Sequence, residues 1–217
     1  MDKARDTFNE DYFLRGKETG VSNYENYIWR PDLTVPACQS IINALDARKG
    51  DRILDFGCAR GYYVRALRQL GLKAYGYDVS AWAIEQADEV VKDFVSNSFP
   101  GAGYDFILCK DVMEHIPTPE LEEVIEAIAR MTWKCALVVV PLTAEPDGAY
   151  IYPRDNDDAT HIQRRNMDGW LQLFERVIDG RIGDADYLIS GSYRMKGLKD
   201  VASVFPRSTG FFFIRRR

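Results

Sequence analysis

"RILDFGCARGYYVRAL", residues 52–67, decides the fold, because an apolar run leads through a glycine-containing loop into an amphipathic segment. "RILDF" has the composition of a buried strand, and "GYYVRAL" predicts a helix that starts directly after the loop. A junction of this kind presents main-chain N–H groups and a helix N-terminus to a ligand. The stretch therefore predicts either a ligand-binding turn or a tight strand-to-helix connection.

The spacing of the loop residues excludes two common phosphate-binding turns. In the dinucleotide pattern G-x-G-x-x-G counted from Gly57, the second and third glycines would be Ala59 and Tyr62, and a tyrosine fits poorly there. No Gly-Lys-Ser/Thr follows, which excludes a P-loop. The pattern that fits is D-x-G-x-G-x-G, with Asp55 first and Gly61 last. An acid in the loop would repel a pyrophosphate but suits a cation such as S-adenosylmethionine (SAM), which carries a sulfonium and an ammonium.

A second acid follows at the spacing of a neighbouring strand. "AYGYDVS" places Asp78 at the end of the next predicted strand, 23 residues after Asp55. An acid at that position can accept hydrogen bonds from both ribose hydroxyls of a nucleoside. The alternative is that the glycines serve only tight packing and that Asp78 caps the helix starting at Ala81.

Three motifs between residues 51 and 141 resemble those of class I SAM-dependent methyltransferases, in particular the type 11/12 group. "ILDFGCARGYYVRAL" is similar to the first motif, "GYDVS" to the ribose-binding motif and "YDFILCKDVMEHI" to the fourth-strand motif. The resemblance implies a SAM site in which the loop surrounds the methionine part, Asp78 holds the ribose and Val79 lies against the adenine. The cofactor-binding residues implied are Asp55, Gly57, Cys58, Ala59, Gly61, Asp78, Val79 and Lys110.

Two details of the resemblance concern the segments after the third and fourth strands. The family usually offers an acid to the adenine amino group after the third strand, and here we expect Asn97 to take that place through its side-chain carbonyl. Glu114 and His115 could be catalytic, but the resemblance favours a role in bracing the loop after the fourth strand.

Strand and helix patterns alternate along most of the chain, which predicts βαβ units. We expect a Rossmann-like, doubly wound, mainly parallel seven-stranded sheet with a C-terminal antiparallel hairpin. The expected strands are 51–56, 73–78, 93–96, 104–111, 134–141, 184–195 and 208–216. The expected helices are 33–48 with Gly50 as C-cap, 61–71, 80–91 with Ser80 as N-cap, 118–131 with Thr118 as N-cap, and 166–178.

The organisation predicted is one methyltransferase domain in four parts. These are an aromatic-rich N-terminal cap (1–33), a SAM-binding core (34–141), an acceptor-side loop or lid (142–165), and a C-terminal helix with the hairpin (166–217).

Composition limits location and partners. The 217 residues carry a net charge of −5, which argues against a duplex nucleic-acid partner. No apolar run reaches the roughly 18 residues of a membrane span, and the N-terminus has no apolar signal core. The four cysteines show no CxxC pairing, so we expect buried free thiols in a reducing cytoplasm and no metal site. The oligomeric state is not predicted.

His161 is the candidate catalytic residue. It lies in "DDATHIQRRNMDGW", residues 157–170, after the fifth strand, where parallel sheets place their active clefts. The segment is similar to a D-x-T-H-x-x-x…W stretch of methyltransferases in glycan and natural-product pathways. His161 would then serve as the base for O-methylation. The alternative is that it bonds to Asp158 or a main-chain carbonyl and orders the loop.

Aromatic and basic residues are candidates for contact with the acceptor, a small molecule or carbohydrate. Tyr24 and Tyr27 are placed to stack on a sugar or aromatic ring, or alternatively to pack within the cap. Arg154 is placed to bind a phosphate or carboxylate, or alternatively to balance neighbouring acids.

Three functions fit these features. The first is a small-molecule or glycan O-methyltransferase. The second is a nucleic-acid methyltransferase, but "CKDVMEH" stands where amino-methylating enzymes carry [D/N/S]-P-P-[Y/F/W], and no proline precedes Cys109 as cytosine-C5 enzymes require. The third is a nonenzymatic SAM-binding regulatory domain, which the glycine loop does not exclude.

Overall fold

The computed structural model describes residues 7–182, 187–195 and 204–217. The start of the predicted cap (1–6), the first residues of the predicted strand 184–195 (184–186) and the connection 196–203 lie outside the described residues. The first strand of the predicted hairpin is described from Tyr187 onward.

One seven-stranded sheet organises the described residues, in the order β3-β2-β1-β4-β5-β7-β6. Its strands are β1 (Arg52–Phe56), β2 (Lys73–Tyr77), β3 (Val95–Ser96), β4 (Tyr104–Lys110), β5 (Thr132–Pro141), β6 (Tyr187–Ser192) and β7 (Thr209–Arg216). The first five strands pair in parallel, whereas β7 runs antiparallel to both β5 and β6. The predicted fold class is therefore confirmed, including the C-terminal hairpin.

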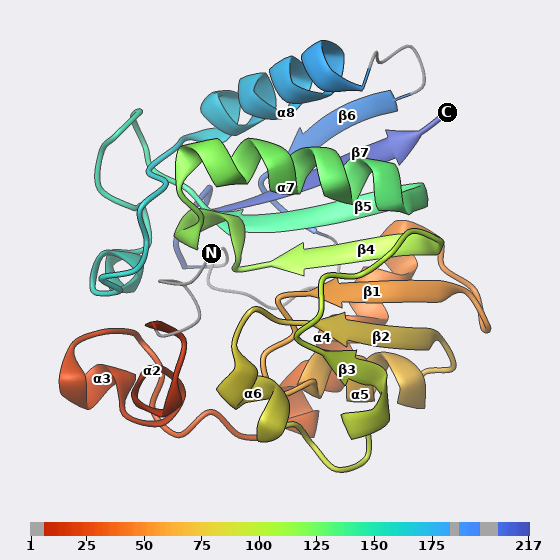
Figure 1. Ribbon diagram of the computed structural model, residues 1–217. Coiled ribbons are helices and arrows are strands. Elements are labelled where there is room, and N and C mark those ends of the chain that lie inside the picture. The colour runs from red at the N-terminus through yellow and green to blue at the C-terminus, as the bar shows by residue number, and fades with distance from the viewer. Residues whose placement is uncertain (1–6, 183–186, 196–203) are drawn as a thin grey trace.

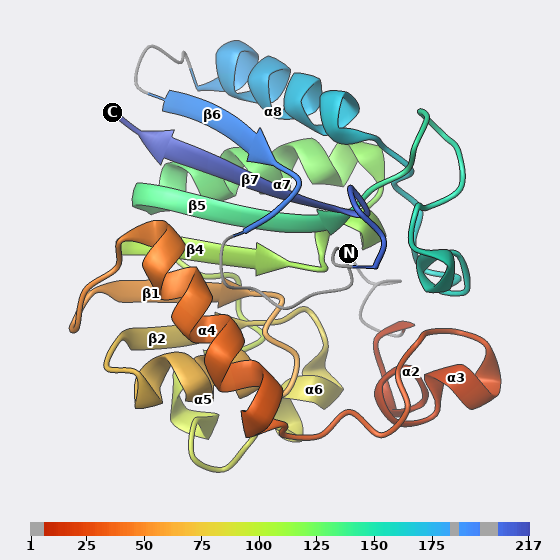
Figure 2. The same cartoon turned by 180° about the vertical axis from the view of Figure 1, so that it is seen from behind.

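Helices cover both faces of the sheet (Figures 1 and 2). On one face lie α4 (Pro31–Leu45) and α5 (Tyr62–Gln69), and on the other lie α7 (Thr118–Met131) and α8 (Met167–Arg181). Successive side chains of a strand point to opposite faces. In β5, Leu137 accordingly packs into the core under α4 and α5, whereas Val138 packs into the core under α7 and α8.

Several predicted helix boundaries or caps are wrong, and the last helix, α8, for example, extends to Arg181 instead of ending at Ile178. The helix α4 begins at Pro31 and ends at Leu45, and Asp46 adopts the left-handed cap conformation (φ 51°), so Gly50 is not the cap. The helix α7 begins at Thr118, with Pro117 rather than Thr118 as its N-cap. The third helix, α6 (Ala81–Glu85), is much shorter than predicted, although the predicted cap is confirmed because the Ser80 side chain accepts from the N–H of Ala83.

The early end of α6 has a cause in the glycine loop. Arg60, in that loop, donates through Nε to the main-chain oxygen of Gln86 at 2.8 Å. Its own carbonyl accepts the N–H of Asp88 at 3.0 Å. These bonds turn the chain after Glu85 back toward the loop, which periodicity alone does not reveal.

The N-terminal segment 7–30 lies beside the carboxyl ends of the parallel strands (Figure 1). It contains α2 (Glu10–Leu14), α3 (Gly16–Thr19) and a cluster of packed aromatic rings. The side-chain amide of Asn23 donates to the carbonyl of Arg154 at 2.5 Å, which joins this segment to the loop after β5. Both segments therefore cover the same end of the sheet.

Two further expectations concern the thiols and the membrane. All four cysteines are buried and free, as predicted. No helix among the described residues is long and apolar enough to cross a bilayer.

Candidate active site

The glycine loop after β1 has a backbone that only small residues allow. Gly57 has φ +88°, and a Cβ added there would lie 2.1 Å from Cγ2 of Val112. The N–H groups of Gly57 and Cys58 both donate to the carbonyl of Tyr77, at 2.7 and 3.0 Å. Gly61 has φ +77° and is the N-cap of α5. The loop therefore fastens the end of β1 to the end of β2.

Asp78 stabilises the one position of the loop where an alanine replaces the usual glycine. Ala59 has φ +47°, a left-handed conformation that costs a non-glycine residue about 1–2 kcal/mol. Its N–H donates to Oδ2 of Asp78 at 2.7 Å, while Oδ1 accepts from the N–H of Ser80 at 2.8 Å. A charge-assisted bond of this kind offsets the cost, which explains how Ala59 is accommodated.

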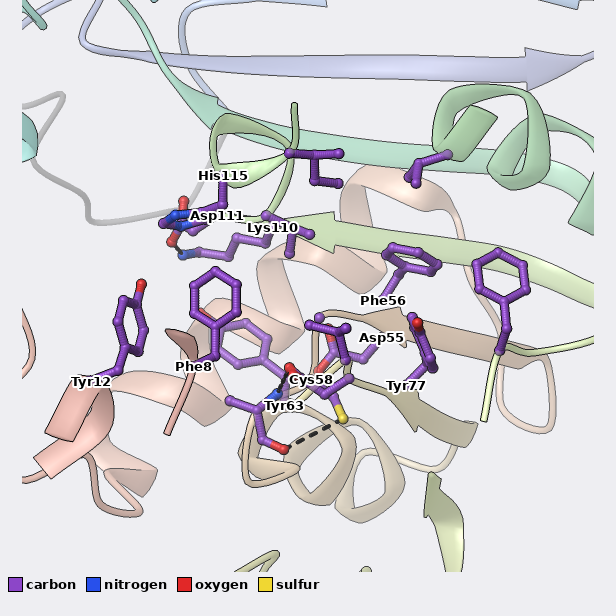
Figure 3. Close-up of a pocket in the computed structure, with 18 of the residues that line it drawn as sticks. Phe8, Tyr12, Asp55, Phe56, Cys58, Tyr63, Tyr77, Lys110, Asp111 and His115 are labelled. Carbon is purple, nitrogen blue, oxygen red and sulfur yellow. Dashed lines mark hydrogen bonds and ion pairs between the residues drawn. The ribbon is translucent and has the colours of Figure 1, made fainter. Parts of the chain in front are cut away.

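A cavity of about 450 Å³ opens over this loop, at the carboxyl ends of β1, β2 and β4 (Figure 3). We call it the cofactor-side cavity. Its lining contains several acids, among them Asp55 and Asp78, together with mainly apolar and aromatic side chains. The lining residues used below are Tyr12, Tyr24, Tyr27, Asp55, Gly57, Cys58, Ala59, Tyr63, Asp78, Val79, Phe99, Lys110, Asp111 and His115.

The two buried acids have unusual protonation behaviour. Burial, and then the charge of Asp78, raise the pKa of Asp55 to about 7, although Lys110 opposes the shift. Burial raises the pKa of Asp78 to about 6, despite its two main-chain hydrogen bonds. Asp55 is buried, and it lies on the wall of the cofactor-side cavity. The cavity therefore offers a carboxylate that a cationic ligand would stabilise.

A second cavity of about 360 Å³ adjoins the first, and we call it the acceptor-side cavity. It lies between the N-terminal segment and the loop after β5, near the 3-10 helix η3 (Pro153–Asn156). The residues shared by both cavities are Tyr12, Tyr24, Lys110, Asp111 and His115. These side chains would therefore lie beside a ligand in either cavity.

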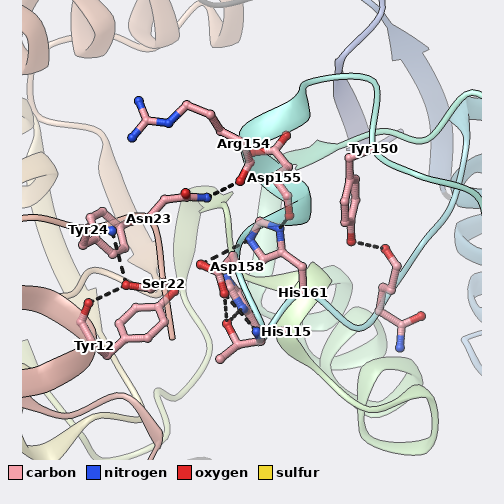
Figure 4. Close-up of polar contacts among 12 residues, drawn as sticks. Tyr12, Ser22, Asn23, Tyr24, His115, Tyr150, Arg154, Asp155, Asp158 and His161 are labelled. Atoms are coloured by element: carbon pink, nitrogen blue, oxygen red, sulfur yellow. Dashed lines mark hydrogen bonds and ion pairs between the residues drawn. The ribbon is translucent and has the colours of Figure 1, made fainter. Parts of the chain in front are cut away.

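His161 lines the acceptor-side cavity and is oriented by its neighbours (Figure 4). Its Nδ1 donates to the main-chain oxygen of Asp155 at 2.9 Å, and its Nε2 lies 3.8 Å from Oδ2 of Asp158. Burial lowers the pKa of His161, although Asp158 opposes the shift. The imidazole is therefore neutral near pH 7, with a lone pair on Nε2.

Glu114 and His115 belong to the 3-10 helix η2 (Met113–His115) that follows β4. The main-chain oxygen of Glu114 accepts the N–H groups of Ile162 and Gln163, at 2.8 and 3.0 Å, which ties the segment after β4 to the segment after η3. The side-chain carboxyl of Glu114 is buried, and burial and then the charge of Asp111 raise its pKa well above the ordinary value. Burial and then His161 lower the pKa of His115 to about 4.

The structure brings most of the sequence-predicted residues to the two cavities. Those on the cofactor-side cavity are Asp55, Gly57, Cys58, Ala59, Asp78, Val79, Lys110, Tyr24 and Tyr27, and those on the acceptor-side cavity are Tyr24, Lys110, Arg154 and His161.

Three placements differ from the prediction. Asn97 is exposed and lines neither cavity, because the segment after β3 presents Phe99 there instead. Gly61 lines neither cavity and serves the turn, where it packs near Val91. Tyr27 lines only the cofactor-side cavity, so it is not placed to touch an acceptor in the second one.

Several lining residues were missed. Tyr12 and Tyr63 line the cofactor-side cavity, and Asp155 lines the acceptor-side cavity. Phe99 had a local signal, as a lone aromatic residue in the polar stretch "SNSFPGAG". The others had none, because their place depends on how distant segments pack.

A family model described as a methyltransferase domain matches residues 31–177. The chain belongs to this family. It is a class I SAM-dependent methyltransferase, and its cofactor is S-adenosyl-L-methionine. The matched residues include the glycine loop, Asp78 and both histidines of the acceptor-side cavity.

Curated relatives are similar to part of the chain in sequence, and solved structures are similar to it in fold. The ubiquinone biosynthesis O-methyltransferase of Burkholderia thailandensis is 27% identical over 116 residues, which cover 46% of this chain and 46% of the relative. The match thus spans less than half of the relative's length. The magnesium protoporphyrin IX methyltransferase ChlM of Synechocystis PCC 6803, with bound SAM, has a TM-score of 0.60 at 18% identity and covers 100% of this chain and 96% of its own. The plantazolicin methyltransferase BamL, in complex with a desmethylPZN analog and SAH, has a TM-score of 0.63 at 13% identity and covers 84% of each chain. The two structures are similar in fold.

Proposed function

We propose that this methyltransferase transfers the methyl group of SAM to a hydroxyl of a small-molecule or carbohydrate acceptor bound in the acceptor-side cavity. The observation that carries the proposal is the neutral imidazole of His161 on a cavity that adjoins the one over the glycine loop. The name of the curated relatives, ubiquinone biosynthesis O-methyltransferase, supports oxygen as the methyl acceptor.

The cofactor-side residues fit SAM in charge and shape. Asp55 offers a buried carboxylate on the wall of the cavity, which suits the ammonium of the methionine part. Asp78 has lone pairs beyond those used for Ala59 and Ser80, and it is proposed to accept from the ribose. When bound, SAM supplies a methyl group on a sulfonium. Gly57 would let the main chain approach the cofactor, and Val79 and Phe99 would offer apolar contact for the adenine.

The protein's part in the transfer is alignment and removal of a proton. Holding the acceptor oxygen in line with the methyl carbon and sulfur, away from water, lowers much of the barrier to such a displacement. Tyr12 and Tyr24, at the boundary of the two cavities, are proposed to hold that alignment. His161 is proposed to accept the hydroxyl proton at Nε2, because its Nδ1 hydrogen is directed to the carbonyl of Asp155.

The remaining residues are proposed to recognise the acceptor. Tyr24 offers a ring for stacking, and the exposed Arg154 offers a guanidinium for a carboxylate or phosphate on the acceptor.

We propose the four-part organisation 1–33, 34–141, 142–165 and 166–217, with the third part as the lid of the acceptor-side cavity. The free thiols suit a reducing compartment such as the cytoplasm.

The test begins with calorimetry of SAM binding and an assay of S-adenosylhomocysteine formation with phenols, catechols, hydroxy acids, nucleotide sugars and RNA. Product with a hydroxyl compound is expected, whereas product only with RNA favours the nucleic-acid enzyme. SAM binding without product from any acceptor favours a regulatory domain. His161→Ala should lower turnover by roughly 10²–10⁴-fold with nearly unchanged SAM affinity. The matched control is Ile162→Ala, the exposed neighbour that lines neither cavity. Loss of SAM affinity together with turnover in His161→Ala would assign the histidine to ordering the loop.

A further inference from the structure

Three potential metal ligands converge in the acceptor-side cavity: Glu114, His115 and His161. One carboxylate oxygen of Glu114 and one ring nitrogen of each histidine all lie within 4.8 Å of one another. The first two residues come from η2 after β4, and the third comes from the loop after η3, so the tertiary fold alone brings them together. Figure 4 shows the two histidines beside each other, with Asp158 next to them.

The hydrogen bonds around the histidines determine which ring nitrogens are free. The carbonyl of Asp155 can only accept, so Nδ1 of His161 carries the hydrogen of that pair. Thr160 Oγ1 donates to the Asp158 carboxylate at 2.5 Å and therefore accepts from Nδ1 of His115 at 2.8 Å. Each imidazole is thus left with a lone pair on Nε2. Metal-binding histidines show this same arrangement, in which the other ring nitrogen donates to a protein oxygen.

Glu114 supplies an independent observation. Its side chain is 1% exposed, and neither carboxylate oxygen has a hydrogen-bond partner among the residues that the structure describes. A buried polar group without a partner is costly, and a buried carboxylate is more so. The neighbouring imidazoles cannot help, because they present lone pairs and not N–H groups. Three electron-pair donors consequently face one another within 4.8 Å.

We propose that Glu114, His115 and His161 bind a divalent first-row transition-metal ion, such as Mn²⁺ or Co²⁺, on the wall of the acceptor-side cavity. Two imidazoles and one carboxylate suit these ions better than Mg²⁺ or Ca²⁺, which prefer oxygen ligands alone. Metal–ligand bonds of about 2.1 Å place donor atoms at most about 4.2 Å apart, so small side-chain rotations are enough to close the site. Asp158, whose Oδ2 lies 3.8 Å from Nε2 of His161, adds negative charge beside it.

The ion leaves coordination positions open toward the acceptor. An acceptor oxygen bound to the ion there would be polarised and oriented. This role of the ion rests on the proposed function, but the existence of the metal site does not depend on it. The lone pair of His161 holds either the metal or a proton. In the metal-loaded protein His161 is therefore a ligand, and its role as a base belongs to the metal-free protein.

Binding is measured on the full chain after treatment with a chelator and removal of that chelator. Mn²⁺ is followed by the loss of its free electron paramagnetic resonance signal, and Co²⁺ by its visible absorption. One ion per chain is expected. Glu114→Gln and His161→Asn should abolish binding, and Thr160→Val, which removes the partner of His115, should weaken it about tenfold or more. Asp157→Asn, an exposed carboxylate in the same segment, is the matched control and should bind as wild type.

Calorimetric SAM binding by every variant reports that the fold is intact. A wild-type chain that binds SAM but takes up neither Mn²⁺ nor Co²⁺ overturns the metal site, as does unchanged binding by Glu114→Gln and His161→Asn. Stoichiometric Mn²⁺ binding without methylation of any hydroxyl compound keeps the metal site and rejects the proposed O-methylation. Methylation by a chain that takes up no metal rejects the metal site alone.

Discussion

Replacement of Asp55 by asparagine tests the electrostatics of the cofactor-side cavity. Burial, and then Asp78, raise the pKa of this carboxyl from the ordinary 3.8 to about 7 in the ligand-free protein. The folded chain therefore binds the proton of Asp55 more tightly than the unfolded chain does. The resulting contribution to stability is complete below about pH 4 and is lost as the pH rises toward 7.

The magnitude follows from the distance between the two pKa values. Each pH unit between 3.8 and about 7 costs the folded wild type about 1.4 kcal/mol, so ionising Asp55 costs about 4 kcal/mol in all and about 3 kcal/mol between pH 5 and pH 8. The asparagine side chain of the variant does not ionise, and Asp78 titrates in both proteins. For a domain of this size, 1 kcal/mol shifts the melting temperature by about 2–4 °C. When the pH is raised from 5 to 8, the melting temperature of the wild type should therefore fall by about 5–10 °C relative to that of Asp55→Asn.

Scanning calorimetry at both pH values, with and without SAM, measures these effects. SAM should stabilise the wild type more at pH 8, where its ammonium meets a carboxylate. It should bind Asp55→Asn about 10- to 100-fold more weakly, because a hydrogen bond to a charged group contributes about 1.5–3 kcal/mol. The control Asp157→Asn removes an exposed carboxylate and should show neither effect. A melting-temperature difference that stays constant with pH would refute the raised pKa, and unchanged SAM affinity would refute the contact with the cofactor.

Three further substitutions test the loop and the acceptor. Asp78→Ala should weaken SAM binding by more than about tenfold in calorimetry, because it removes the proposed hydrogen-bond acceptor for the ribose hydroxyls and the bond to the N–H of Ala59. A SAM affinity equal to that of wild type would reject both roles of Asp78. Gly57→Ala should cost about 2–4 kcal/mol in denaturant unfolding, because its Cβ meets Val112 at a positive φ, and Val112→Ala should restore part of the loss; no change would mean that the loop relaxes freely. Arg154→Gln should raise KM for carboxylate-bearing acceptors more than for neutral ones at similar kcat, and an equal effect on both would remove Arg154 from recognition.

Local pattern was sufficient for the sheet and the glycine loop. The alternation of strands and helices reflects burial on two faces, which each segment encodes in its own sequence. Asp55 and Asp78 each lie at the carboxyl end of a strand, and adjacent parallel strands bring these ends together, so the sequence located the acids of one cavity. The wrong end of α6 shows the limit of local pattern, because bonds made by Arg60 from another segment terminate it.

The expected position of Asn97 on the cofactor-side cavity is not found in the structure, for a related reason. The segment after β3 has no periodicity, and chemistry alone favoured the amide of Asn97. The chain instead turns Phe99 toward the cavity and leaves Asn97 in solvent, a choice that depends on the packing of Phe99 against Phe56 and Tyr77.

By itself, the sequence determined a parallel sheet, its glycine loop and two acids suited to SAM, because these features depend on residues close together in the chain or on adjacent strands. The tertiary structure decided the acceptor side. Tyr24, His115 and His161 come from segments far apart in the chain, and none of those segments has a pattern that specifies its neighbours. Only folding fixes the tautomers of the histidines and leaves the carboxylate of Glu114 without a donor among the described residues, since both depend on which groups surround them.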